Sequence, residues 1–270
     1  MEPQRTSVDP PIKLAIADSL RMKIEKGQLE PGDSLPTLHE LTTKWNCSIT
    51  SAREALNLLK EQGLVSGGRG RPLRVRGLGA QTRRSSTRHQ WEKDRVHEPE
   101  EERRKAGTSE LETNKPIGDV DFTATYSRIP ASKDVATALG VEEDSDVIQR
   151  VYETKDRKTK HRTNWSVSYI PVSLISKNPE LLDEKNEPWP GGTQHQLSTV
   201  GIEIMKVVDE VTSRMSTTVE RQLWGLDTGV PMLRVRRISY DRHGTPVEIS
   251  DADYPADRTV LEFMTELKEW

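Results

Sequence analysis

Two helix signals separated by a short polar turn, within residues 31–76, constrain this chain more than any other feature. Thr37 is followed three residues later by Glu40, a pairing that predicts a capping box at the start of a helix ending near Trp45. An Asn-Cys pair then forms the turn, and Ser48 is suited to cap the next helix. Proteins use two helices in this relation to place side chains in the major groove of DNA.

The second of these helices has one apolar face. Ala52, Leu56 and Leu59 recur at helical spacing, so we expect them to lie in the core. Residues on the other side or at the N-terminal end are then available to DNA. A hairpin with a glycine-rich tip follows, and its positive charges suit phosphates or the minor groove. The candidates from this pattern are Thr50, Ser51 and Arg53 on the helix and Arg69, Arg71, Arg74 and Arg76 on the hairpin.

Length and composition set the outer limits. A chain of 270 residues has room for about two domains. A single cysteine, Cys47, cannot form an internal disulfide, which suits a reducing cytoplasm. The sequence contains no apolar run long enough to span a membrane, and residues 1–11 lack the features of a signal peptide. We therefore expect a cytoplasmic protein without a membrane partner.

Charge is unevenly distributed along the chain. Residues 1–95 carry 17 Lys and Arg against 11 Asp and Glu, whereas the remaining residues carry 23 against 32. The basic excess coincides with the helix pair and hairpin, and the acidic remainder is a poor surface for nucleic acid. This asymmetry favours two domains with different tasks, one of which binds DNA.

A charged segment separates the two predicted domains. Residues 78–116 have few aliphatic and many charged side chains, so we expect a linker between a DNA-binding domain at 1–77 and a second domain at 117–270. The segment is interpreted as a flexible solvated tether. The alternative is that its basic half follows the DNA backbone.

The second domain alternates strand and helix patterns. Capped helices are predicted at 132–139 and 217–226, and the stretches 178–192 and 189–201 are interpreted as loops. An antiparallel sheet with helices on one side, an α+β fold, accounts for this order. The predicted strands cover residues 120–126, 147–154, 164–170, 202–211, 232–240 and 245–252, with a last candidate at 259–267.

The segment Ile12 to Arg76 resembles the winged helix-turn-helix domain of the GntR family of bacterial transcription regulators. The resemblance rests on IADSLRMKIEKGQLEPGDSLP, HEL, SxxSAREAL, LKEQGLV and the glycine-rich wing. It implies DNA contacts from residue 39, from Ser48 and its successors, and from Gly70 in the wing. His39 and Ile49 stand where the family usually has Arg, so the preferred half-site is expected to differ. Ile49 is expected to press on a thymine methyl group.

The C-terminal part resembles the UTRA effector-binding domain of the HutC-type branch of the same family. The matching pieces are DFTATYSRIPASKDVATALGV, VIQRVYETKD, SVSYIP, GVPMLRVRRISYD and VEISDADYPADR. The resemblance implies a chorismate lyase-like fold and a cytoplasmic, nucleoid-associated repressor. It also implies a homodimer on a palindromic operator, released by a small metabolite. The implied pocket residues are Phe122, Thr123, Ala124, Arg150, Tyr152, Ser168, Glu248 and Tyr254.

Two of these residues suggest what the metabolite carries. Arg150 is suited to hold a carboxylate or phosphate in a bidentate fork, and Glu248 to accept from sugar hydroxyls or an amine. The alternative is that Arg150 and Glu248 pair with each other or with Asp257 and Arg258. Tyr152 stands where many relatives carry a second Arg, which weakens the case for a phosphorylated ligand.

Catalytic and metal-binding motifs are absent from the sequence. It contains no HExxH, CxxC, GxSxG or Walker pattern, and its histidines lack metal-ligand spacing. We therefore expect no catalytic residue, no metal and no cofactor. The expected function is that of an effector-controlled, sequence-specific DNA-binding regulator that acts as a repressor. The alternatives are a lyase-like enzyme fused to a DNA-binding module and a ligand-independent DNA-binding regulator.

Overall fold

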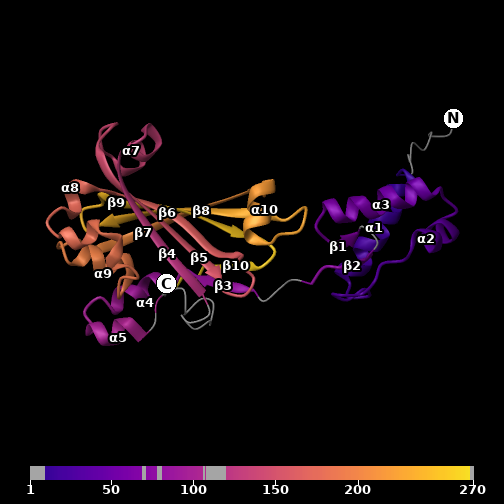
Figure 1. Cartoon of the computed structure of the whole chain (residues 1–270), viewed down its shortest axis with the longest axis horizontal. Coiled ribbons are helices and arrows are strands. Elements are labelled where there is room, and N and C mark those ends of the chain that lie inside the picture. Colours follow the sequence, from indigo (N-terminus) through magenta and orange to yellow (C-terminus); the bar gives the residue numbers. More distant parts are fainter. Residues whose placement is uncertain (1–9, 69–70, 78–80, 106, 108–119, 268–270) are drawn as a thin grey trace. The chain divides into compact units, whose positions relative to one another are not determined.

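The computed structural model describes residues 10–68, 71–77, 81–105, 107 and 120–267. The chain divides into two compact units (Figure 1). Unit 1 comprises Met1–Gly79 with Leu226–Val230, and unit 2 comprises Ala80–Gly225 with Pro231–Trp270. Among the described residues, no helix is both long and apolar enough to cross a bilayer.

The N-terminal unit contains the predicted helix pair. The Thr37 hydroxyl accepts from the Glu40 amide at 3.2 Å, and the Glu40 carboxylate accepts from the Thr37 amide at 2.7 Å. This is the predicted capping box, and Asn46 ends the helix in the left-handed conformation. Ser48 caps the next helix through the Ser51 amide, as predicted. The elements are α1 (Ile12–Glu25), α2 (Leu38–Trp45), α3 (Ile49–Glu61), β1 (Val65–Gly68) and β2 (Arg71–Val75).

Strands β1 and β2 form the predicted hairpin. Val65 pairs with Val75 and Ser66 with Arg74, and the register then shifts before Gly68. Gly67 lies in this bulge with φ +113°, and a Cβ atom there would lie 2.7 Å from the carbonyl oxygen of Pro72. Only glycine accommodates both the conformation and the close approach.

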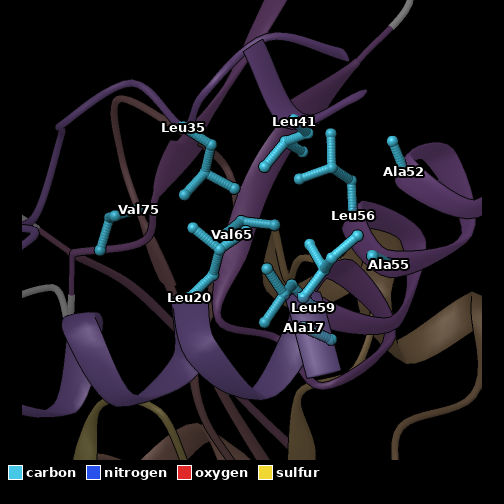
Figure 2. Close-up of a cluster of buried hydrophobic side chains, with 11 residues drawn as sticks. Ala17, Leu20, Leu35, Leu41, Ala52, Ala55, Leu56, Leu59, Val65 and Val75 are labelled. Carbon is cyan, nitrogen blue, oxygen red and sulfur yellow. The ribbon is translucent and has the colours of Figure 1, made fainter. Parts of the chain in front are cut away.

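A single hydrophobic core holds this unit together (Figure 2). Ala52 and Leu59 are fully buried and Leu56 nearly so, which confirms the predicted inner face of α3. They pack with side chains from every other element of the unit. The remaining buried members are Ile16, Ala17 and Leu20 of α1, Leu41 of α2, Ala55, and Leu35, Val65 and Val75 around the hairpin.

The C-terminal unit is built on a six-stranded antiparallel sheet with the order β4-β5-β6-β9-β8-β7. All six predicted strands are present, and most extend a few residues beyond the predicted ends. The α+β fold class is confirmed. The strands are β4 (Val120–Pro130), β5 (Asp146–Asp156), β6 (Arg162–Pro171), β7 (Ile204–Met215), β8 (Pro231–Asp241) and β9 (Pro246–Pro255).

Helices cover both faces of the sheet, so the prediction of helices on one side was wrong. On one face, Val135 and Leu139 of α7 (Lys133–Leu139) pack against Ile249. On the other, Ile170 packs with α8 (Val172–Ile175) and α9 (Gly192–Ser198). Neighbouring residues of one strand bury side chains on opposite faces, so both faces need a cover. The other short helices are η2 (Pro179–Leu182), η3 (Glu184–Asn186) and α10 (Thr218–Trp224).

Two segments interpreted as irregular are ordered. Helix α9 lies within the stretch 189–201, where we expected a loop. Residues 82–105 of the expected tether form β3 (Thr82–Ser85), α4 (Arg88–Asp94) and α5 (Glu100–Lys105). Helix α4 lies against α9, and β3 pairs in parallel with β10 (Thr259–Glu262). The last predicted strand therefore exists, but it pairs with the segment expected to be the tether. Contacts with α9 and β10 order the segment, and the sequence did not reveal them because these partners lie far away along the chain.

Candidate DNA-binding surface and ligand cavity

The N-terminal end of α3 presents a small polar surface to solvent. Ile49 is 54% exposed, and the side chains of Ser48, Thr50 and Arg53 are exposed as well. Ser51 is half-buried, and its hydroxyl lies 3.0 Å from that of Ser48. An isoleucine exposed to this degree at a helix start gains nothing from the core, which leaves it available for an apolar contact elsewhere.

The neighbouring helix and the hairpin carry the other predicted contacts. His39 is exposed on α2. Arg69 and Gly70 lie outside the described residues, and of Arg71 only the backbone position in β2 is described. Arg74 donates to the carbonyl oxygen of Gly32 at 2.7 Å.

Two further basic side chains hold the hairpin in place through hydrogen bonds to backbone carbonyl oxygens. Lys60 of α3 donates to the carbonyl oxygen of Gly67 at 3.0 Å, and Arg76 donates to that of Gly63 at 3.3 Å. Lys60 escaped the sequence analysis because a lysine at the end of a helix is ordinarily a solvated residue. These contacts hold the hairpin against α3.

The C-terminal unit contains a cavity of about 490 Å³ over one face of the sheet. Phe122, Tyr152, Ser168, Glu248 and Tyr254 line it, so the structure brings together five of the eight predicted pocket residues. The alternation of side chains along each strand places these five on one face. Further lining comes from polar side chains of β5, β6, β8 and β9, namely Thr154, Asn164, Ser166, Ser239 and Ser250.

Thr123 and Ala124 are not among the lining residues. Thr123 follows Phe122 directly and therefore points to the opposite face, where its hydroxyl lies 3.5 Å from the carbonyl oxygen of Glu153. Ala124 shares the face of Phe122 and pairs with Tyr152, whose ring stacks on that of Phe122 with centroids 6.2 Å apart. A methyl group beside two large rings does not reach the cavity.

Arg150 lies beneath the cavity and is 1% exposed. Its Nε donates to the Ser168 hydroxyl at 3.0 Å, one Nη to Gln196 Oε1 at 2.6 Å, and the other Nη to Glu248 Oε1 at 2.6 Å. Burial opposes its charge, but the neighbouring Tyr152 and Glu248 raise the pKa of Arg150 above its ordinary value. The guanidinium is thus engaged with the protein itself, which matches the alternative in which Arg150 pairs with Glu248.

Glu187 organises the adjoining wall of the cavity. One of its carboxylate oxygens accepts from the hydroxyls of Tyr126 and Tyr152 and from the Gln196 amide, and the other accepts from the Trp189 amide. Burial is the main cause that raises the pKa of Tyr126 to about 12 and the pKa of Tyr152 well above its ordinary value. Both phenols therefore stay protonated and act as donors.

Sequence reasoning missed Glu187 and Gln196 because both lie in stretches interpreted as loop. It also missed the residues of the expected tether that reach the cavity. Among these, the guanidinium of Arg84 lies 4.0 Å from the centroid of the Tyr254 ring, and Glu92 of α4 lines the cavity. No local signal distinguishes these charged residues from solvated ones.

The described part of the chain shows no cluster of three or more His, Cys, Asp and Glu side chains that could hold a metal ion. The cavity offers hydroxyls, amides, carboxylates and guanidinium groups around aromatic rings. Such a lining suits a small polar molecule held by hydrogen bonds.

Comparison with known proteins agrees with this geometry. Residues 12–75 match the family described as bacterial regulatory proteins of the gntR family, and residues 123–259 match the UTRA domain. The chain is 26% identical to the HTH-type transcriptional repressor NagR of Bacillus subtilis, over 95% of this chain and 96% of that protein. It is also 26% identical to the HTH-type transcriptional regulator RB1450 of Rhizobium meliloti, over 93% of each chain.

Solved structures show the same fold. A GntR-family transcriptional regulator superposes with a TM-score of 0.70 at 23% identity, over 96% of this chain and 99% of the other. PhnF from Mycobacterium smegmatis superposes with a TM-score of 0.51 at 19% identity, over 94% and 100%. With its GntR-type DNA-binding domain and a UTRA domain that spans half of its length, this chain belongs to the GntR family as a ligand-responsive, DNA-binding transcriptional regulator.

Proposed function

We propose that the protein is a repressor that binds a palindromic operator as a homodimer and is released from DNA by a small molecule in the cavity of its C-terminal domain. The repressor NagR, similar over nearly the whole chain, supports repression. The single observation that carries the proposal is the pairing of an exposed α3 N-terminus with a polar cavity of about 490 Å³ in one chain. The setting is the bacterial cytoplasm, where the operator lies.

Recognition of DNA is assigned to the N-terminal end of α3. Thr50 and Arg53 are exposed there beside Ile49, and the helix start is fixed by the Ser48 cap. A helix held in this way enters the major groove with its first turn and reads base edges. The contact set comprises His39, Ser48, Ile49, Thr50, Ser51 and Arg53, with Arg69, Gly70 and Arg71 of the wing.

Dimerisation is needed because one small domain makes few phosphate contacts. Two copies place two recognition helices about one DNA turn apart, so that the half-sites add their affinities. Strand β7 lies at an edge of the sheet and carries exposed apolar side chains, which supports a second copy at this edge. These side chains are Met205, Val208, Val211 and Met215.

The cavity is assigned to the effector. Its volume falls within the range of small-molecule sites. A ligand-independent regulator would have no use for such a cavity and would be expected to fill it with side chains. Phe122 and Tyr152 offer stacked rings, while Ser168 and Glu248 offer polar atoms at the Arg150 network.

The DNA-binding part is tested by fluorescence anisotropy on DNA from upstream of the gene for this protein, with a scrambled competitor and a salt series. We expect tight binding that prefers the palindrome. Equal binding to both DNAs, lost steeply with salt, would leave only a nonspecific basic module. The Ile49→Arg variant tests the role of Ile49, because unchanged affinity for the same operator would count against a contact with a thymine methyl group.

A further inference from the structure

One wall of the cavity comes from a segment that neither family match covers. The matches span residues 12–75 and 123–259, whereas α4 and the residues around it lie between them. The lining residues from this segment include Arg84, Arg88, His89, Trp91, Glu92 and Arg95. The wall is therefore formed by residues that lie outside both family matches.

Helix α4 is fixed to the C-terminal unit by long-range hydrogen bonds. The Gln194 side chain donates to the carbonyl oxygen of His89 at 2.8 Å, and Lys93 donates to that of Ile204 at 2.9 Å. The helix also approaches the start of α9 closely, because a Cβ atom on Gly192 would lie 2.6 Å from Glu92 Oε1. These contacts hold Glu92 at the cavity.

The guanidinium groups that line the cavity are engaged. Arg237 donates to both oxygens of Asp209 at 2.7 and 2.9 Å, and Arg95 donates to Glu98 at 2.8 Å. Arg103 donates to the carbonyl oxygen of Pro190 at 3.2 Å. Arg104 pairs with Glu100, and Arg84 and Arg88 also have interaction partners within the protein. The positive charge of these side chains is thus partly balanced by protein carboxylates and carbonyl oxygens.

Carboxylates at the cavity have more capacity left. Within the described residues, the hydrogen bond that Glu92 accepts is a long one of 3.4 Å from the Gln194 amide. Glu248 accepts from Arg150 through Oε1 and is also one of the residues that line the cavity. A carboxylate has about four acceptor positions, so both residues can still accept from a ligand.

We propose that Glu92 of α4 is a ligand-contacting residue of this cavity and that the cavity takes a polar ligand carrying an ammonium group. The inference rests on the proposed function, since it names the class of ligand for the same cavity. The ligand then contacts the segment that joins the two family-matched domains along the chain.

The electrostatics of Glu92 agree with a cationic ligand. Burial is the main cause that raises the pKa of Glu92 to about 7, and the charge of Glu248 adds to it. The Gln194 amide and the charges of Arg237 and Arg88 act in the opposite direction. An ammonium group would stabilise the ionised form of Glu92 by a charge-assisted hydrogen bond.

Three matched probes test the ligand class on the full chain at a pH of about 8, where Glu92 is ionised. Sorbitol is neutral, glucamine carries a primary amine in place of one hydroxyl, and sorbitol 6-phosphate carries an anion. Binding is followed by calorimetry on the wild type, on Glu92→Gln and on the control Glu101→Gln, an exposed residue of α5. The polyol frame suits the hydroxyl-rich lining of the cavity.

We expect glucamine to bind about tenfold more tightly than sorbitol, and Glu92→Gln but not Glu101→Gln to remove that preference. An unchanged preference in Glu92→Gln, tightest binding of the phosphate, or binding of none of the probes would overturn the inference. If Glu92→Gln does not fold, hydrogen exchange in the wild type decides: glucamine must slow exchange of the α4 amides, and unchanged exchange refutes the contact. Failure of the proposed function would be seen separately, because the same wild-type sample would then show no preference for the operator over scrambled DNA in the anisotropy assay.

Discussion

Removal of the buried guanidinium of Arg150 should destabilise the C-terminal domain strongly. The side chain is 1% exposed and bonds to Ser168, Gln196 and Glu248. Arg150→Met keeps most of the volume but leaves the Glu248 carboxylate without its counter-charge. Loss of one partner of a buried ion pair costs about 3–5 kcal/mol. We expect the free energy of unfolding to fall by about 4 kcal/mol.

The assay is urea unfolding followed by tryptophan fluorescence in a Trp45→Phe background. All remaining tryptophans then belong to the C-terminal unit, so the signal reports that unit alone. Arg128→Met is the matched control, because Arg128 pairs with Asp146 at an exposed site. The urea midpoint of this control should equal that of the Trp45→Phe background.

A double-mutant cycle separates the ion pair from simple loss of packing. Arg150→Met and Glu248→Gln each break the pair, but together they remove both charges. The double variant should therefore lose about 2 kcal/mol less than the sum of the single losses. Additive losses, or a loss below about 1 kcal/mol for Arg150→Met alone, would refute a structural ion pair. Arg150 would then be available to hold an anionic ligand.

Three further outcomes follow from the same structure. Leu59→Ala should lower the free energy of unfolding of the N-terminal domain by about 2–5 kcal/mol in thermal or urea unfolding, whereas the half-buried Leu58→Ala should cost less. Because burial raises the pKa of Glu92 to about 7, folding favours its protonated form, and stability falls as pH rises from about 4.5 through 7. The free energy of unfolding of Glu92→Gln should thus exceed that of the wild type by up to about 3 kcal/mol above pH 7 and equal it below pH 4.5. An equal increase at both pH values would exclude titration of Glu92 as the cause. Arg53 is exposed on α3 and is expected to contact a phosphate, so Arg53→Ala should weaken DNA binding and reduce the dependence of log affinity on log salt by about 1, measured by anisotropy. An unchanged salt dependence would exclude that phosphate contact.

Local signals predicted the DNA-binding domain well. The Thr37–Glu40 capping box, the Ser48 cap and the apolar face of α3 depend on residues within a few positions of each other. Such interactions form whatever the rest of the chain does, so short sequence windows identify them. The contacts of His39 and Ile49 with DNA stay predictions, since exposure alone does not name a partner.

The cavity was only partly predictable. Strand alternation places Phe122 and Thr123 on opposite faces, and this could have been predicted from the sequence. The family resemblance instead placed both residues in the pocket. Helix α4 could not be recognised, because its anchors, such as the bond from Gln194 to His89, join residues about a hundred positions apart. In composition a charged helix docked in this way does not differ from a solvated tether.

The central claim, that occupation of the cavity changes DNA affinity, is tested by one comparison of dissociation constants. Operator affinity of the full chain is measured by anisotropy with and without the low-molecular-mass extract of the source cells. A Ser250→Trp variant, in which the cavity is filled, serves as the control. We predict that the extract weakens binding by about 5- to 150-fold in the wild type and leaves the variant unchanged. Equal affinity with and without extract, or the same shift in both proteins, would contradict the account.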